Sequence, residues 1–271
     1  MTLRKLVYIV GGLIVLGVLG VGALVVVTML RDDDPELLTS APLIPTAAAS
    51  TTTPPSAGSP AAASTAPAAT STTTTAPAPA AATSGVLRFV VDPAQSSATY
   101  VVREKLARLP VESDAAGTTT DTAEGDVTGE LFVTPQGLAS TNKSTFKVDL
   151  NTLKSDEGLR DNFVRSNTLQ TGQAANRYAT FVIDSVTGFP SNYVENTEVS
   201  VTLAGQMTIK GITKPVAFEV KARRAGDILT ATADTTFNMS EFGINPPNVP
   251  SARSFDAVRL QVVLVTKRAT A

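Results

Sequence analysis

The chain has 271 residues, with 22 Lys and Arg against 24 Asp and Glu, and it contains neither Cys nor His. This charge balance leaves no basic excess for nucleic acid, and the absence of Cys excludes disulfides and thiolate nucleophiles. The absence of His removes Ser-His-Asp catalysis and His-based metal sites, so we expect no enzyme, no catalytic residue, no metal and no cofactor.

An uncharged run rich in Val, Leu, Ile and Gly extends over residues 6–30. At about 1.5 Å per residue, a helix of this length exceeds the roughly 30 Å of hydrocarbon in a bilayer. The run therefore predicts a transmembrane anchor. A signal peptide is the alternative, but its apolar region usually has about 7–15 residues and ends in small ones, whereas this run ends in Met29 and Leu30.

The charges that flank this run predict its orientation. Arg4 and Lys5 precede it and only Arg31 follows, which places residues 1–5 in the cytoplasm and the rest of the protein outside the cytoplasmic membrane. Three adjacent aspartates, residues 32–34, come next. We interpret them as a solvated flank, because no partner ligands for a metal accompany them.

Residues 39–84 consist almost entirely of Ala, Pro, Ser, Thr and Gly. Such a composition cannot bury a core, so we predict a disordered linker over residues 31–84. It would reach on the order of 140 Å as an extended polyproline helix and nearer ~40 Å as a coil. Either length would hold the following domain away from the membrane.

Residues 85–271 form the globular domain, and residues 203–220 give its clearest pattern. Apolar and polar residues alternate on both sides of a break from Lys210 to Pro215, which predicts a β-hairpin with one buried face. Gly211 permits a positive φ in the turn, and Pro215 is expected at the start of the second strand.

Further strand patterns account for most of the domain, and they give about eight strands. Because the segments between them are mostly too short for crossover helices, we expect an antiparallel sheet in the form of a barrel or a sandwich. The additional strands are predicted at residues 86–91, 99–102, 127–133, 146–150, 181–183, 229–239 and 258–264.

One segment, residues 155–166, predicts a short helix. Ser155 is a suitable N-cap, acidic residues fill the first turn, and Leu159 and Phe163 are spaced i, i+4. Gly158 weakens the helix, so packing of Leu159 and Phe163 should hold it. We assign its carboxylates to capping and ion pairs, and not to acid–base catalysis.

The order of several segments carries a family resemblance. They are DPAQSSATY (residues 92–100), the helix SDEGLRDNFVRS, NRYATF (176–181), GQMTIKGITKPV (205–216), FGI (242–244) and DAV (256–258). Together they resemble the YceI-like family. The resemblance implies an eight-stranded, lipocalin-like antiparallel barrel in a bacterial extracytoplasmic protein, with a polyisoprenoid lipid as its ligand.

The resemblance also implies a set of residues that face the lumen, where an eight-stranded barrel holds a small ligand or is filled by its own side chains. For each of them, core packing is the alternative role. They are Tyr100, Phe146, Val148, Phe181, Ile183, Leu203, Met207, Phe218, Phe237 and Leu260, with Phe163 on the helix over one opening.

The sequence departs from the family pattern in three respects. It has Phe89 where members often carry Trp, it lacks their histidines, and it has an insertion at residues 103–124. We expect the insertion to be a solvated loop. A cover over the barrel mouth and a weak calcium site are the alternatives, the latter because the segment and its border contain Asp114, Asp121, Glu124 and Asp126.

These observations predict a membrane-anchored extracytoplasmic protein that sequesters an isoprenoid or another long apolar lipid. They identify no protein partner. The alternative from a different class is a structural or adhesive barrel of the cell envelope, with a solid core and no ligand.

Overall fold

The computed structural model describes residues 37–43, 85–119 and 125–269. The predicted anchor at residues 6–30 and most of the predicted linker lie outside these ranges. Among the helices of the described ranges, none combines the length and the apolar character needed to cross a bilayer.

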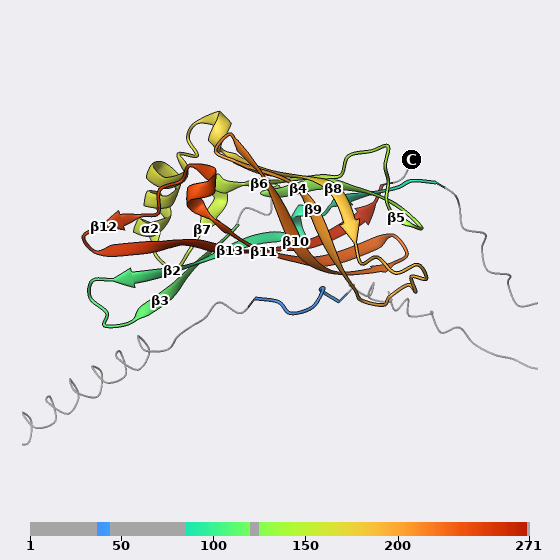
Figure 1. Ribbon diagram of the computed structural model, residues 1–271, viewed down its shortest axis with the longest axis horizontal. Helices are drawn as coiled ribbons and strands as arrows, with labels where there is room; N and C mark the ends of the chain where they lie inside the picture. Colours follow the sequence, from blue (N-terminus) through green and yellow to red (C-terminus); the bar gives the residue numbers. More distant parts are fainter. Residues whose placement is uncertain (1–36, 44–84, 120–124, 270–271) are drawn as a thin grey trace, which may run out of the picture.

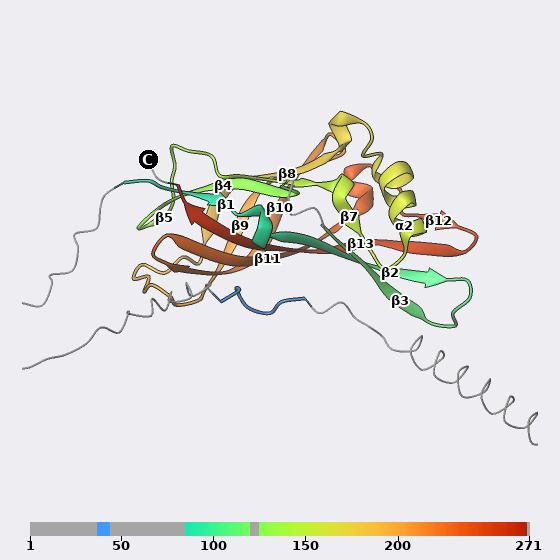
Figure 2. The same ribbon diagram turned by 180° about the vertical axis from the view of Figure 1, so that it is seen from behind.

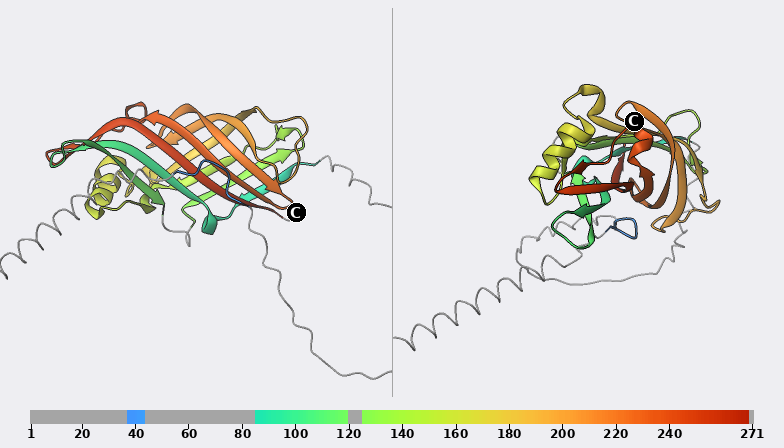
Figure 3. Two further views of the ribbon diagram at one scale, coloured as in Figure 1. Left: turned by 90° about the horizontal axis from the view of Figure 1, so that it is seen from below. Right: turned by 60° about the vertical axis from the view of Figure 1, so that its left-hand side comes forward.

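Antiparallel strands close into an eight-stranded barrel, seen from the side and obliquely in Figures 1 and 3. Strand β13 pairs with β11 on one side and returns to β1 on the other, which completes the ring. The predicted antiparallel barrel with one short helix is therefore confirmed for the described residues. In ring order the strands are β1 (Leu87–Val91), β4 (Val127–Thr134), β6 (Thr145–Asp149), β8 (Tyr178–Thr187), β9 (Val199–Ile209), β10 (Ile212–Ala225), β11 (Ile228–Asn238) and β13 (Ala252–Arg268).

A second group of strands extends the wall at one end of the barrel. β2 (Ser97–Leu106) pairs with β13, β3 (Glu112–Thr119) pairs with β2, and β7 (Leu153–Lys154) pairs with β3. The prediction of a solvated loop at residues 103–124 is thus wrong for most of that segment. Its strands escaped detection because the buried positions of β3 hold small residues, Ala115, Gly117 and Thr119, rather than large apolar ones.

The predicted hairpin is β9 and β10, and its turn is tighter than expected. Ile209 pairs with Ile212, so Lys210 and Gly211 form a two-residue turn, with φ of 51° and 74°. Pro215 lies inside β10 and not at its start. It is tolerated because β11 pairs with β10 only from Glu219 onward, so no strand needs the missing N–H on that side.

The core occupies the inner face of the barrel. Val201, Met207 and Ile209 of β9 belong to one buried cluster with Phe218 and Val220 of β10, as the alternation predicts. Aromatic contacts support this cluster: the Phe181 and Phe218 rings lie 4.8 Å apart and the Phe237 and Phe242 rings 5.2 Å apart, both edge to face.

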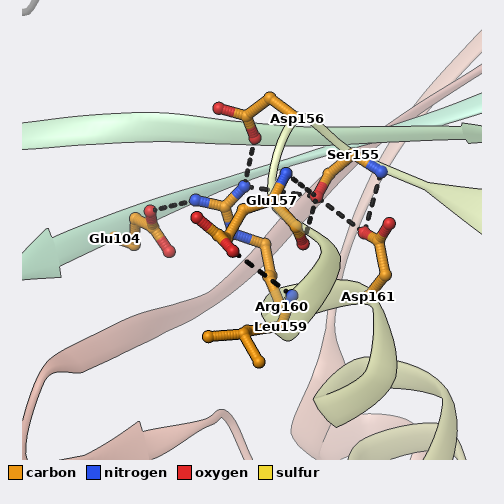
Figure 4. Close-up of polar contacts among 7 residues, drawn as sticks. All are labelled: Glu104, Ser155, Asp156, Glu157, Leu159, Arg160 and Asp161. Carbon is orange, nitrogen blue, oxygen red and sulfur yellow. Dashed lines mark hydrogen bonds and ion pairs between the residues drawn. The ribbon is translucent and has the colours of Figure 1, made fainter.

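The predicted helix is α2 (Gly158–Phe163), which continues as a π-helical turn over Val164–Leu169. Its cap is Glu157 and not Ser155. Leu159 is 79% exposed, so the expected packing of its side chain is wrong. A buried carboxylate holds the helix instead: Asp161 Oδ1 accepts hydrogen bonds from Ser155 N at 2.8 Å and from Ser155 Oγ at 2.6 Å (Figure 4).

Short elements connect the strands. They are β5 (Gly137–Leu138), β12 (Asn248–Val249) and the 3₁₀ turns at Pro93–Gln95, Leu150–Thr152, Ala174–Asn176 and Met239–Phe242.

Candidate functional site

The barrel lumen contains two adjoining cavities. One, of about 610 Å³, lies at the α2 end, and we call it the helix-end cavity. The other, of about 210 Å³, lies toward the opposite end, and we call it the far cavity. Val148, Ala179, Met207 and Leu260 line both, and we call these four residues the waist. The lumen therefore has the volume of a small-molecule pocket, which is about 300–1,000 Å³.

The far cavity has an almost wholly apolar wall. A loop between β8 and β9 contributes Phe189 and Tyr193, whose rings are stacked 6.1 Å apart. The Tyr193 hydroxyl donates to the Arg224 carbonyl at 3.0 Å and accepts from the Arg224 amide at 2.8 Å. These bonds satisfy the polar end of the tyrosine, so its ring presents an apolar surface to the cavity.

The helix-end cavity combines an apolar wall with a charged rim. Arg160 of α2 pairs with Glu104 of β2, with Nη2 and Oε1 2.9 Å apart, and also with Asp156 (Figure 4). Burial opposes the charge of Arg160, but the two carboxylates outweigh burial and raise the pKa of the guanidinium. Arg160 therefore stays charged, and its pair with Glu104 joins α2 to β2.

Tyr100 lies beneath this rim. It lines the helix-end cavity, and burial raises the pKa of its phenol to about 12. The ring also fills the space next to Gly117 on β3, where an added Cβ would come within 2.4 Å of Tyr100 Cε1. A larger residue than glycine at position 117 would therefore displace the Tyr100 ring.

The structure brings ten of the eleven predicted lumen residues to the walls of the two cavities. Their contact with a ligand stays a prediction. Tyr100, Phe163 and Phe237 line the helix-end cavity, Phe146, Phe181, Leu203 and Phe218 line the far cavity, and Val148, Met207 and Leu260 line both.

Ile183 is the exception, because it lines neither cavity. The pairing of β8 with β9 shifts register between Ile183 and Ser185. Ile183 itself is buried opposite Gly205, and beyond the bulge Val186 lies opposite Leu203 and lines the far cavity, where unbroken alternation would place Ser185.

Sequence reasoning missed the charged rim and the aromatic loop. Glu104 had a detectable signal, because it follows Tyr100 and Val102 at inward positions of one alternating strand. A carboxylate at an inward position calls for a partner, and the helix supplies Arg160. Phe189 and Tyr193 lie in a loop where no alternation exists to mark them.

In the part of the chain that the structure describes, no group of three or more acidic residues is placed to hold a metal ion. Of the insertion's carboxylates, Asp114 pairs with Arg103, with Oδ1 and Nε 3.3 Å apart. Asp121 and Glu124 lie outside the described ranges.

Several solved structures are similar to this chain. A polyisoprenoid binding domain from Saccharophagus degradans, implicated in plant cell wall breakdown, has the same fold, with a TM-score of 0.50 at 12% identity over 68% of this chain and 99% of that one. BcnA of Burkholderia cenocepacia aligns with a TM-score of 0.48 at 19% identity over 66% and 99% of the two chains. The YCEI protein of Campylobacter jejuni gives 0.43 at 11% identity over 62% and 91%.

A search of curated proteins finds no match. The model of the YceI-like domain, however, matches residues 89–266, which is well over half of the sequence and nearly all of the barrel. The chain therefore belongs to the YceI-like family.

Proposed function

We propose that this protein binds one long apolar lipid of the isoprenoid type in its barrel lumen. The observation that supports this most strongly is the pair of adjoining apolar cavities that meet at the waist. A thin, branched hydrocarbon chain suits two narrow cavities in series better than a compact ligand does. The polyisoprenoid binding domain of S. degradans, which shares the fold, supports the same class of ligand.

The driving force would be removal of the chain from water. Each Å² of apolar surface buried contributes roughly 25 cal/mol, so about 300 Å² would give ~7 kcal/mol before the entropy cost of binding. The far cavity would hold the end of the tail. A polar headgroup would lie at the rim of the helix-end cavity, where Glu104 and Arg160 provide charges.

The proposed setting is the outer side of the cytoplasmic membrane. The apolar run at residues 6–30, with Arg4 and Lys5 before it, supports a single-pass anchor with the barrel outside the cytoplasm. An anchored barrel would sequester lipid locally and would not shuttle it by diffusion. We propose no enzymatic role.

A structural barrel with a solid core is the competing function. Such a barrel would be filled by its own side chains, and a cavity of about 610 Å³ is far larger than the voids of a well-packed core. The cavities thus favour a lipid-binding barrel over a solid structural one.

The test is a titration of the full chain with polyprenyl alcohols of increasing length. We expect affinity to rise several-fold with each added isoprene unit, because more apolar surface is buried, and then to level off when the lumen is full. Gln206→Ala, on the exposed face of β9, is the control variant and should bind as the unaltered protein does. No uptake at any length, or an affinity that does not depend on length, would refute the proposal.

A further inference from the structure

Residues 37–43 lie against the outside of the barrel, although at least 40 residues of sequence separate them from its first strand. In Figures 1 and 2 this segment is the blue trace that runs beside β11. Its composition and position predict part of the linker. Its contacts show that the barrel has a defined site for it.

The first part of the segment is held by one side chain. Leu38 N donates to Gln261 Oε1 at 2.8 Å, and Gln261 Nε2 donates to the Leu38 carbonyl at 2.9 Å. Gln261 is only 3% exposed and also donates to Asp234 Oδ1 at 2.8 Å. The amide of Gln261 thus bonds both backbone groups of Leu38, as a neighbouring strand would.

Three further side chains bond the rest of the segment. Ala41 N donates to Glu198 Oε2 at 3.0 Å, and Thr230 Oγ1 donates to the Pro42 carbonyl at 2.7 Å. Lys221 Nζ donates to the Thr39 carbonyl. These bonds come from β10, from β11 and from the residue before β9. Ala41 is only 4% exposed where it lies against the wall.

The wall beneath the segment has the composition of a built site. On β11, Leu229, Ala231 and Ala233 line the far cavity, so Thr230 and Thr232 point outward, yet they are 0% and 1% exposed. Polar side chains on the outside of a barrel normally face water, and buried ones need partners. We call Glu198, Lys221, Thr230 and Gln261 the docking face.

We propose that residues 37–43 are a docking segment which the docking face holds against the barrel, and that this contact keeps the barrel close to the membrane. Residues 31–36 alone separate the segment from the apolar run. Fully extended, six residues span about 20 Å, whereas the whole linker was expected to reach far beyond that. The membrane part of this proposal rests on the proposed anchor, and the docking itself does not.

Tethering explains how so short a segment can stay bound. A segment that belongs to the same chain as its site has an effective concentration on the order of 1 mM. A weak contact, with a Kd of about 0.1 mM, would then be occupied about nine-tenths of the time. Loss of one or two hydrogen bonds should release the segment. The distance between the barrel and the membrane would therefore depend on a small number of side chains.

The test uses the full chain, which has no native Cys, with spin labels at Ser40→Cys and Asp227→Cys. Both positions are exposed, and Asp227 lies in the turn between β10 and β11. We expect one narrow distance in the parent and a broad, longer distribution in Gln261→Ala/Thr230→Val. Gln206→Ala is the matched control and should keep the narrow distance. A broad distribution in the parent, or no change in the double variant, would overturn the proposal.

Two further measurements address a double variant that does not fold and docking between two copies of the chain. If the double variant fails to fold, a free peptide of residues 36–44 added at millimolar concentration to the doubly labelled parent should release the segment, and failure to do so would count against docking. Dilution with unlabelled chain should leave the narrow distance unchanged. Its disappearance would mean that the segment docks on a second copy, which contradicts the proposal.

A measurement on liposomes that contain the full chain tests the docking contact and the membrane anchor independently. A quencher attached to the lipid headgroups should reduce the fluorescence of a dye at position 227 in the parent protein. In Gln261→Ala/Thr230→Val this reduction should be several-fold smaller. A narrow spin-label distance without quenching would disprove the proposed anchor and leave the docking contact intact.

Discussion

The inner and outer faces of β11 and β13 show two different kinds of binding surface made by the same strands. Inward residues such as Ala231 and Leu260 line apolar cavities, while the outward Thr230 and Gln261 bond the backbone of another segment. The inner face can attract a ligand only through buried area, which discriminates little between apolar chains. The outer face selects backbone geometry through hydrogen bonds. Alternation along one strand thus separates the two functions.

The largest expected effect is on lipid binding at the inner face. Met207→Arg places a charge at the waist, where the two cavities adjoin, so a long chain can no longer extend from one to the other. We expect the affinity for a long polyprenyl alcohol to fall at least about a hundredfold, or ~2.7 kcal/mol, in an equilibrium titration.

The docking contact is the internal control for this variant. The narrow distance between labels at positions 40 and 227 should persist, because Met207 does not touch the outer face. Unchanged lipid affinity in a folded Met207→Arg protein would contradict the assignment of the lumen as the ligand site.

The second prediction concerns the rim at the α2 end. Glu104→Ala removes the buried partner of Arg160 and leaves the guanidinium with Asp156 and the Ser155 hydroxyl. We expect a loss of about 2 kcal/mol in the free energy of unfolding, measured by denaturant titration. Glu112→Ala, an exposed position on the neighbouring strand, is the matched control and should change little. Equal effects of the two substitutions would show that the rim does not stabilise the fold.

The third prediction follows from Tyr100, whose phenol has a pKa raised to about 12 by burial. A raised pKa means that the folded state favours the neutral phenol. Its contribution to stability is therefore complete below pH ~10 and is lost as the pH rises toward ~12, by up to about 2 kcal/mol. Tyr100→Phe should reduce this alkaline loss of stability relative to the unaltered protein. An alkaline profile identical to that of the unaltered protein would contradict the burial of Tyr100.

The smallest expected effect lies on the outer face. Thr232 Oγ1 is buried without a hydrogen-bond partner among the described residues. Thr232→Val removes this hydroxyl while keeping a similar side-chain volume. We therefore expect the free energy of unfolding, measured by thermal or denaturant titration, to rise by about 1 kcal/mol. Thr266→Val on the inner face removes a hydroxyl that bonds the Leu229 carbonyl at 3.0 Å, and it should destabilise instead. A loss of stability in Thr232→Val would contradict the description of this face.

Sequence patterns predicted the barrel well because its long strands alternate large apolar residues with polar ones. The hairpin of β9 and β10 and the inward positions of Leu203, Met207 and Phe218 all follow from that alternation. The patterns failed where alternation breaks or is hidden, as at the bulge after Ile183 and in β3, whose buried residues are small.

The outer face was beyond sequence reasoning for another reason. The docking segment is recognised mainly through its backbone, and backbone groups leave no pattern in the sequence. Thr230 and Gln261 look like ordinary exposed residues of alternating strands. They are buried in the structure, where residues 37–43 lie against them.

The most direct test of the central claim is native mass spectrometry of the full chain, released from detergent after incubation with a long polyprenyl alcohol. We predict a complex of one lipid per chain that is retained by the parent and absent in Met207→Arg. A spectrum that shows only the bare chain, in a preparation shown to be folded, would contradict the claim that the lumen holds an apolar lipid.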